Sequence, residues 1–318
     1  MIVNLPTWDA LNANALKLYF RAWQGIVHTL IDFDEIHQSS VSDWFDHTDY
    51  RYTDEREEYL EMAQEDFHAF ASIAQQANEL ALKARITAVS PYLLLLNSDV
   101  SLNNVTASIE FTSLRTLDAV DLPKAVNALT PTPVSDSYKQ RYSQMRVQRN
   151  QYTHLGDTTA VLDPLSMCAA LIDQYRELWP DRAWLSDRLA STYVRERFFD
   201  GKHWSPRQAI MHLIEYDQAL IPAAGFKKLF GAKKADIKFG CFSCQDDWAV
   251  RRNGPSIMEV QTAFYNKSKK AIHCLICDVD FEAILKACNA CDGKFVAPDV
   301  AQYGAGRCFT CGEESTYL

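Results

Sequence analysis

Two groups of residues in this sequence have types and spacings that suit chemistry: a polar cluster in residues 146–156 and a set of cysteines after residue 240. Residues 146–156 read RVQRNQYTHLG, and we expect them to end a helix at Gly156. Arg149 and His154 are five residues apart, which places them about 140° apart around an ideal helix. If the last turn unwinds near Gly156, His154 can swing toward Arg149. The cluster would then present a fixed cation, the amide of Asn150 and a titratable imidazole together.

These groups suit the cleavage of a phosphodiester bond in RNA. A guanidinium holds the phosphate and neutralises the charge that develops on it. An imidazole, with an ordinary pKa of about 6.5, moves protons to or from a ribose hydroxyl or a leaving oxygen at neutral pH. Such a site needs no metal. On spacing alone, the favoured interpretation is a different one: a helix C-terminus that carries cations because they suit the helix dipole.

Eight of the nine cysteines lie after residue 240 and form four Cys-x-x-Cys pairs. The pairs are Cys241/Cys244, Cys274/Cys277, Cys288/Cys291 and Cys308/Cys311. Two intervening residues let a tight turn present both sulfurs to one tetrahedral Zn²⁺. The simplest assignment is sequential, with two structural Zn²⁺ per chain and no catalytic metal, because each set of four thiolates leaves no open position. A cross-braced arrangement, first pair with third, remains open.

The same cysteines bear on the compartment. A thioredoxin-type redox role needs one pair in a βαβ context, not four pairs. Metal-ligand spacing is typical of a reducing compartment. The opening MIVNLPTWDA lacks a basic start before an apolar run, and VSPYLLLL is too short to span a bilayer. We therefore expect a soluble, cytoplasmic protein with no membrane association.

The formal net charge of −9 argues against general polyanion binding. Residues 226–318 nevertheless carry a slight excess of basic side chains, and aromatic residues Phe242, Trp248, Phe264 and Tyr265 alternate with them. Basic and aromatic side chains together suit contact with nucleic acid. The candidate RNA-binding residues are Arg146, Arg251, Arg252, Lys267, Lys269 and Lys270. A solvated lysine face is the alternative.

The elements that would position these groups are mostly helices. Thr7 can cap a helix over residues 8–31, and apolar residues at steps of three and four predict a long helix over 54–89 that Pro91 ends. Residues 97–134 predict a short strand pair or ordered loop and then a brief helix, LPKAVNAL. Ser135 or Asp136 can cap the motif helix, and further helices fit 158–179, 183–199 and 205–221. Long helices with short breaks favour a bundle. Helical periodicity ends at a boundary near residues 225–238.

The R-x₄-H motif of Arg149 and His154, with a polar residue after the arginine and late in a helical bundle, resembles the HEPN superfamily. The stretches ELALKARITAVSPYLLL and FTSLRTLDAVDLPKAV are similar to it as well, so the resemblance covers roughly residues 10–180. It implies a metal-independent endoribonuclease in which Arg149 and His154 are the catalytic pair and Asn150 supports them. It also implies a homodimer that joins two motifs in one cleft.

Family members commonly act as toxins or in bacterial antiviral defence, which implies an anti-phage or toxin effector held in check by a regulatory partner protein. Gly156 stands where some HEPN toxins carry a tyrosine that an antitoxin modifies, so that control is not expected here.

The resulting prediction is a mainly α protein: a HEPN-like antiparallel helical bundle (1–180), a helical extension and linker (181–234) and a small cysteine-rich zinc-binding module with short β-strands (235–318). We expect the module to help select the RNA or a partner. The alternative function is a non-catalytic adaptor, in which a zinc-ribbon-like module binds nucleic acid or protein and the helices dimerise it. The adaptor tolerates Arg149 and His154 apart on the outside, whereas the ribonuclease needs both exposed in a shared cleft.

Overall fold

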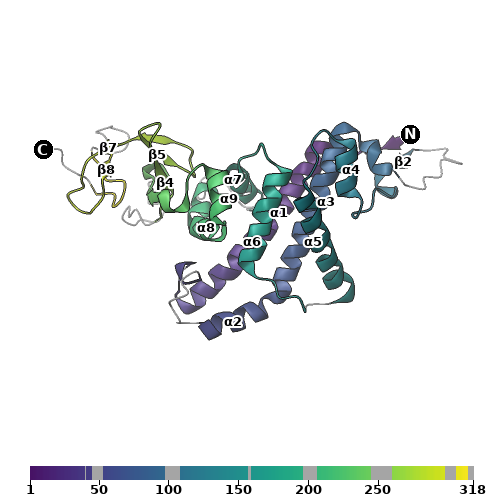
Figure 1. Ribbon diagram of the computed structural model, residues 1–318, viewed down its shortest axis with the longest axis horizontal. Coiled ribbons are helices and arrows are strands. Elements are labelled where there is room, and N and C mark those ends of the chain that lie inside the picture. Colours follow the sequence, from purple (N-terminus) through teal and green to yellow (C-terminus); the bar gives the residue numbers. More distant parts are fainter. Residues whose placement is uncertain are drawn as a thin grey trace. The chain divides into compact units, whose positions relative to one another are not determined.

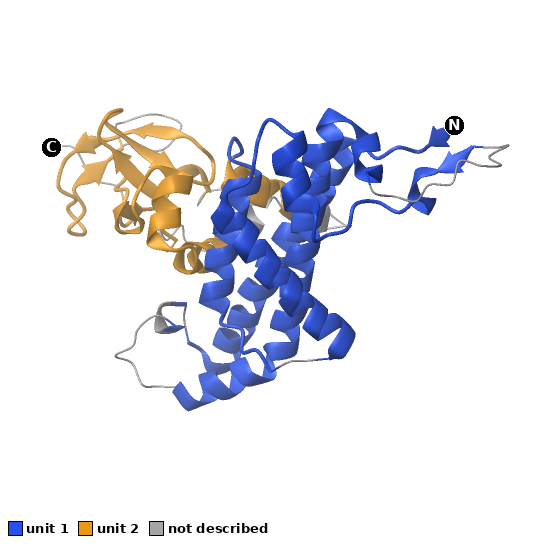
Figure 2. Cartoon of the chain, turned by 45° about the vertical axis from the view of Figure 1, so that its right-hand side comes forward, with its two compact units in different colours: residues 1–182 blue, residues 183–318 orange. Residues whose placement is uncertain are grey.

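The protein is mainly helical, with a few short strands. The structure is a computed structural model that describes residues 1–39, 41–44, 53–96, 108–156, 159–195, 206–244, 260–297 and 306–313. The chain divides into two compact units, Met1–Arg182 and Ala183–Leu318 (Figure 2). The boundary expected near 225–238 therefore falls inside the second unit, at the place where helices give way to strands.

The first unit is built around four helices that pack against one another (Figure 1). They are α1 (Trp8–His37), α3 (Gln64–Val89), α5 (Asp136–Leu155) and α6 (Pro164–Leu178). Helix α3 is central, because it contacts the other three. Its contact with α1 is close: a Cβ on Gly25 of α1 would collide with the ring of Phe70 on α3. A larger residue at position 25 would therefore push these two helices apart.

Local signals set several boundaries of these helices. The Thr7 hydroxyl accepts the N–H of Ala10 at 3.2 Å, and the Ser135 hydroxyl accepts that of Tyr138 at 3.2 Å, so both predicted N-caps are confirmed. Helix α1 continues past the expected end near residue 31 to His37. Buried residues such as Leu30 and Phe33 extend its core-facing side through this last part.

The single helix expected over residues 54–89 is wrong, because the structure has two helices there. Helix α2 (Thr53–Met62) buries none of its residues, and α3 begins after Ala63. The Gln64 amide explains the break: it donates to Leu60 O at 2.9 Å and to Leu162 O at 3.2 Å, and it accepts the Leu162 N–H at 2.7 Å. Gln64 thereby ties the start of α3 to the segment that precedes α6.

Shorter elements complete the first unit. Strand β1 (Ile2–Val3) pairs in parallel with β2 (Ile109–Glu110), so a strand pair is formed, although between distant segments. The expected brief helix is α4 (Leu122–Leu129). The 3₁₀ turns are η1 (Val41–Trp44), η2 (Pro91–Leu95) and η3 (Phe111–Ser113). Pro91 follows Ser90, the C-cap of α3, so the helix ends where the sequence predicted.

In the part of the second unit that the structure describes, three helices precede a small β region. The helices are α7 (Trp184–Arg195), α8 (Pro206–Leu220) and α9 (Ala223–Phe230), followed by the turn η4 (Lys234–Asp236). Arg188 of α7 and Asp217 of α8 form a fully buried ion pair at 3.2 Å. Removing either partner would leave a buried charge, which typically costs about 3–5 kcal/mol.

The β region contains a four-stranded antiparallel sheet in the order β3-β4-β5-β6. The strands are β3 (Ile237–Phe239), β4 (Ala263–Asn266), β5 (Ala271–Cys274) and β6 (Asp280–Glu282). A separate pair, β7 (Ile284–Leu285) and β8 (Phe295–Val296), follows. These short strands are too few to build a large core, so we expect the stability of the β region to depend on the cysteines between them.

Candidate functional site

Helix α5 stays helical through the end of the polar motif. Gly156 ends the helix in the left-handed region, with φ +64°, and its N–H contacts the carbonyls of Gln151 and Tyr152. The last turn is therefore closed. The unwinding that would bring His154 toward Arg149 does not occur, because Gly156 satisfies the final carbonyls of an intact helix.

One face of α5 packs on α3 through polar and aromatic contacts. The Tyr138 hydroxyl donates to Asn78 Oδ1 at 2.8 Å, and both side chains are buried. Near the other end, the Tyr152 ring stacks on buried His68, with ring centroids 5.1 Å apart. This face therefore orients α5 about its own axis and decides which motif residues remain at the surface.

Arg149 lies at the edge of that face and is held by α3. Its Nη2 donates to Glu79 Oε1 at 2.7 Å, and the two side chains are only 22% and 20% exposed. The Nε of Arg149 is buried with no hydrogen-bond partner. Lys83, one turn further along α3, donates to Thr116 Oγ1 at 3.3 Å. Glu79 thus fixes Arg149 by an ion pair, and the remaining exposed part of the guanidinium stays open to solvent.

From Arg149 a continuous polar arc runs around α5 to His154. At 100° per residue, the order is Arg149, Thr153, Arg146, Asn150 and His154, spanning about 140°. Asn150 and Arg146 are half-buried, whereas Thr153 and His154 are exposed. We call this set the polar arc of α5. It places the predicted catalytic residues on one helix face, but it leaves Arg149 and His154 at opposite ends without a contact between them.

Charged side chains near the polar arc shift the pKa of Tyr142, a buried tyrosine of α5. Burial raises the pKa of Tyr142 above its ordinary range, and the carboxylate of Glu79 raises it further, while Arg146 and Arg149 oppose the rise. The Tyr142 hydroxyl donates to Ala119 O at 2.7 Å, which keeps it in its neutral form. Tyr142 is therefore a structural support beneath the arc.

The eight paired cysteines form two separate groups of four. Cys241, Cys244, Cys274 and Cys277 make one group, and Cys288, Cys291, Cys308 and Cys311 make the other. Within each group the sulfurs lie within 4.8 Å of one another. This is the sequential grouping, and it excludes the cross-braced alternative. Lone Cys168 is buried in α6, as expected for a core residue.

The sulfur spacings fit a tetrahedral metal. The distances are 3.6 Å for Cys241–Cys277, 3.9 Å for Cys244–Cys274, and 3.7 Å for both Cys288–Cys311 and Cys291–Cys308. A Zn–S bond of about 2.3 Å predicts sulfurs about 3.8 Å apart at the corners of a tetrahedron. Each group therefore has the ligand set and the size that one Zn²⁺ requires.

Backbone N–H groups prepare the second cluster for a cation. The N–H groups of Ala290, Gly293 and Thr310 donate to the sulfurs of Cys288, Cys291 and Cys308 at 3.2–3.4 Å. The N–H of Ala290 is the main cause that lowers the pKa of Cys288 to about 7. Such bonds favour thiolates, which are the form that binds zinc.

Two phenylalanines join the clusters. Phe242 lies between the cysteines of the first pair and Phe309 between those of the last pair; both are fully buried, with ring centroids 4.7 Å apart. The Gly240 N–H also donates to Phe309 O at 3.0 Å. The expectation that Phe242 is an exposed aromatic contact for nucleic acid is therefore wrong, because its ring belongs to the core between the two clusters.

The basic residues near the first cluster are partly neutralised. Lys269 pairs with Asp280 at 2.6 Å, and His273 contacts the same carboxylate at 3.0 Å. Lys267 and Lys270 are exposed on the β4–β5 turn. Arg251 and Arg252, together with Trp248, lie outside the described residues. Of the candidate RNA-binding lysines in the second unit, Lys269 is therefore paired, whereas no ion pair of Lys267 or Lys270 is found among the described residues.

Gly293 was not identified from the amino-acid pattern, and it allows the second cluster to close. A Cβ at this position would lie 2.7 Å from Cys308 Sγ and 3.1 Å from Cys291 Sγ. We expect Gly293→Ala to weaken zinc binding at this cluster about tenfold or more, because overpacking displaces two ligands. Competition with a chromogenic chelator measures the change. Asp292→Ala, at the exposed neighbouring position, is the control, and equal affinity in both variants would contradict the role of Gly293.

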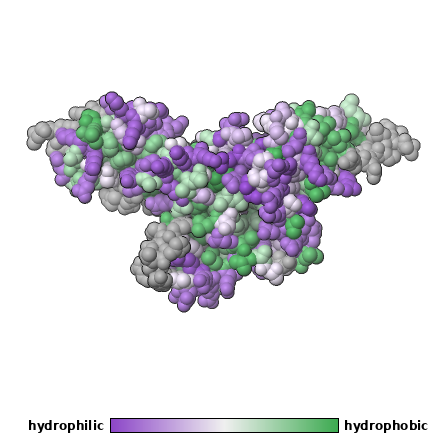
Figure 3. Space-filling view, viewed as in Figure 1, coloured by the Kyte–Doolittle hydropathy of each residue, from purple (hydrophilic) through white to green (hydrophobic). Residues whose placement is uncertain are grey.

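A groove in the first unit was also missed, because its lining comes from separate segments. It lies between α3, α5, residues 161–163 and α6, and it has a volume of about 780 Å³. Hydrophobic side chains gather on the molecular face that α5 and α6 form (Figure 3). The groove therefore lies beside the motif helix.

The chain was compared with protein-family models, curated proteins and solved structures, and none of them matches it. The HEPN resemblance consequently stays a prediction that rests on the motif and its helical setting. Among the helices that the structure describes, none is long and apolar enough to cross a lipid bilayer.

Proposed function

We propose that this protein is a metal-independent endoribonuclease whose site is the polar arc of α5. The observation that carries the proposal is the ion pair that holds Arg149 against Glu79 at 2.7 Å. It fixes a guanidinium at the surface of the helix that also presents an exposed histidine one and a half turns further on. A fixed cation and a free imidazole are the groups that RNA cleavage without a metal requires.

The arc supports a site shared by two chains. Arg149 and His154 are separated by about 140° around the helix and about 7.5 Å along it, so they do not converge on one phosphate from one chain. A second copy of α5, running in the opposite direction across a two-fold axis, would place His154 of one chain toward Arg149 of the other. The homodimer expected from the HEPN resemblance would thus bring an imidazole and a guanidinium to the same phosphate, which a single chain cannot do.

In this proposal each group has one role. One imidazole takes the proton of the ribose 2′-hydroxyl as that oxygen attacks the phosphorus, and the other protonates the leaving 5′-oxygen. The guanidiniums of Arg149 hold the phosphate while its negative charge grows. Asn150, between Arg146 and His154 on the arc, orients the strand. The products are a 2′,3′-cyclic phosphate and a 5′-hydroxyl.

The cysteine clusters have a structural role in the same proposal. Each has four thiolates for one ion, so no coordination position is left for a substrate. The second unit then serves to choose the RNA or the regulatory partner that restrains cleavage. A place in toxin or antiviral defence systems follows from the family resemblance and is part of the proposal.

Mixing two inactive variants tests the shared site. Arg149→Ala and His154→Ala chains each lack one group, whereas a mixed dimer retains one complete Arg149/His154 pair across the interface. We expect a refolded equimolar mixture to be more active on a fluorogenic RNA than either variant alone, because a mixed dimer keeps one imidazole and one guanidinium, but less active than the wild type, which has two of each. Light scattering checks the dimer. Recovery of no activity, or a fully active monomer at micromolar concentration, would contradict the proposal.

A second candidate is a non-catalytic adaptor, and one observation favours it. The Glu79–Arg149 pair, together with the stacking of Tyr152 on His68, also has a purely structural explanation as part of the α3–α5 contact. The zinc-ribbon-like module would then bind nucleic acid or protein, and the helices would dimerise it. An adaptor binds its target equally well with Ala at position 154 and leaves RNA ends unchanged.

A further inference from the structure

We propose that α9, η4 and β3 form a second contact surface for RNA, at which exposed lysines bind the phosphate backbone of a single strand. We call residues 223–240, which contain these three elements, the lysine segment. This inference rests on the proposed function, because that function makes RNA the substrate. The whole chain carries 32 basic and 41 acidic side chains. An RNA strand is therefore repelled unless basic side chains gather locally.

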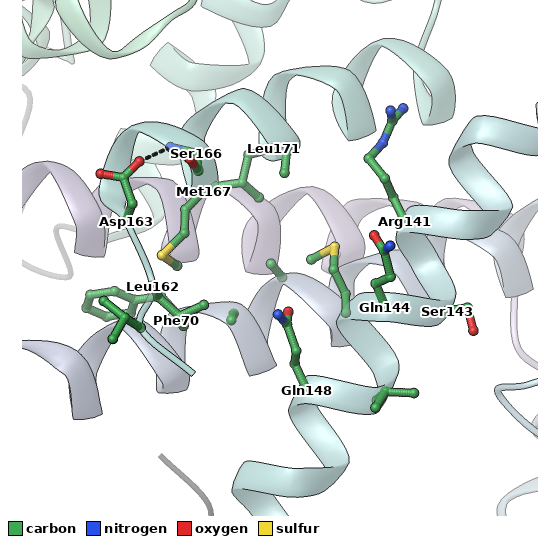
Figure 4. A pocket seen from close by; sticks show the side chains of 16 residues that line it. Phe70, Arg141, Ser143, Gln144, Gln148, Leu162, Asp163, Ser166, Met167 and Leu171 are labelled. Carbon is green, nitrogen blue, oxygen red and sulfur yellow. Dashed lines mark hydrogen bonds between the residues drawn. The ribbon is translucent and has the colours of Figure 1, made fainter. Parts of the chain in front are cut away.

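The groove in the first unit does not provide such a gathering of positive charge. Its charged lining residues are Arg141 and Asp163 (Figure 4). Arg141 pairs with Asp173 at 3.5 Å, and the Asp163 carboxylate accepts the Ser166 N–H at 2.7 Å. One cation and one anion leave the lining without a net charge, so the groove has no attraction for a phosphate chain.

The lysine segment, in contrast, has a clear excess of positive charge. It contains five lysines and a single acidic residue, Asp236, whose Oδ2 accepts the backbone N–H of Lys233 at 3.0 Å. Four of the lysines are exposed, and no ion pair of theirs is found among the described residues: Lys227, Lys228, Lys233 and Lys238. Four ammonium groups are thus free to contact phosphates.

Several contacts hold the backbone of the lysine segment in place. Phe226 is fully buried. Gly231 ends α9 with φ +72°, and its N–H donates to Lys227 O at 3.0 Å. The fifth lysine, Lys234, is half-buried, and its Nζ donates to Ala219 O at 2.8 Å, which ties η4 to the end of α8. A fixed backbone reduces the conformational entropy that the exposed lysines lose when they bind a strand.

The composition of this surface favours a phosphate chain over an acidic protein. Besides the lysines and Asp236, the exposed residues of the segment are small: Ala223, Ala224, Gly231 and Ala235. Within residues 223–240, all described, no large apolar side chain is exposed. Protein interfaces are usually anchored by large side chains that become buried, whereas a phosphate backbone is bound mainly by charge. Lysine suits this task, because its compact charge sits on a flexible stem.

The salt dependence of RNA binding tests this contact. Fluorescence anisotropy measures the affinity of the full-length, zinc-loaded protein for a short 2′-O-methyl RNA, which cannot be cleaved, between about 50 and 200 mM salt. Each phosphate contact with a single strand contributes about 0.7 to the steepness of log affinity against log salt concentration. We expect Lys227→Gln/Lys228→Gln and Lys233→Gln/Lys238→Gln each to weaken binding and to lower this steepness by about 1.4.

Two further double variants are the controls, and circular dichroism should show the same helix content in all four. Lys17→Gln/Lys124→Gln removes two exposed lysines of the first unit, and therefore the same net charge, but should keep the wild-type slope. Lys227→Arg/Lys228→Arg keeps the charge of the segment and should keep the slope as well. Unchanged slopes in both glutamine variants of the segment would overturn the inference. An equal decrease in the Lys17/Lys124 control would also overturn it, because net charge rather than this surface would then govern binding.

Cleavage assays separate this inference from the proposed function. A protein that cleaves RNA, but whose lysine-segment variants keep the wild-type slope, retains the function and loses the contact surface. A wild-type protein that binds RNA with a slope dependent on these lysines, but never cleaves it, retains the contact surface and loses the function.

Discussion

Replacing His154 with alanine is expected to lower the rate of RNA cleavage by about 10²–10⁴-fold, because that is the usual contribution of a positioned proton-transfer group. His154 is exposed at the last turn of α5, so the change removes no core contact. Arg149→Ala should have a loss of similar size, since it removes the group that balances charge on the phosphate. Single-turnover cleavage of a short labelled RNA measures both effects.

The controls for this prediction lie on the same helix. Gln151→Ala replaces another exposed residue of α5 outside the polar arc and should leave the rate unchanged. Circular dichroism should show the same helix content in all variants. Cleavage should persist during a short exposure to EDTA and leave 2′,3′-cyclic phosphate ends. Full activity in His154→Ala, or an absolute need for added Mg²⁺, would exclude this assignment.

The second large effect concerns the cysteine clusters. Cys308→Ser is expected to unfold the β region of the second unit, because a structural zinc site contributes about 10–16 kcal/mol of binding energy that is also folding energy. Elemental analysis should find two Zn²⁺ in the wild-type chain and at most one in the variant. The β region has few strands and little core of its own, so no other interaction compensates for the lost ion.

Cys168→Ser is the matched control, because this cysteine is buried in α6 and belongs to neither cluster. It should retain both ions. In Cys308→Ser, the first unit should stay helical, since α1, α3, α5 and α6 share a core that contains no cluster cysteine. A folded Cys308→Ser protein with two ions, or a wild-type protein with fewer than two, would refute the two-site assignment.

Local chemistry explains which features the sequence predicted well. Two-residue spacing sets each cysteine turn, so the cluster members could be assigned before the fold was known. Thr7 and Ser135 act on N–H groups three residues away, and Gly156 ends α5 by its own backbone conformation. Each of these features depends on residues within a few positions of one another, and for such features the amino-acid pattern is informative.

The features that escaped prediction depend on residues far apart in the chain. The break before α3 requires Gln64 to bond Leu162, 98 positions later. The partner of Arg149 is Glu79, 70 positions earlier, and neither residue type alone indicates the other. The groove draws its lining from α3, α5, α6 and a connecting segment. Periodicity identifies the helices but not their rotation about their axes, and that rotation decides which side chains meet.

The stacking of Phe242 on Phe309 has a consequence for how the second unit acquires its metal. Each ring sits inside a cysteine turn of a different cluster, so ordering one turn also orders the surface on which the other must pack. The two binding events are then linked. Binding of the first ion loses most of the conformational entropy of both turns, and the second ion binds more tightly because its cysteine turn is already ordered. Chains with a single ion should be rare at every zinc concentration. The unit would respond to its zinc supply as a threshold, with empty and doubly loaded chains as the two populated species.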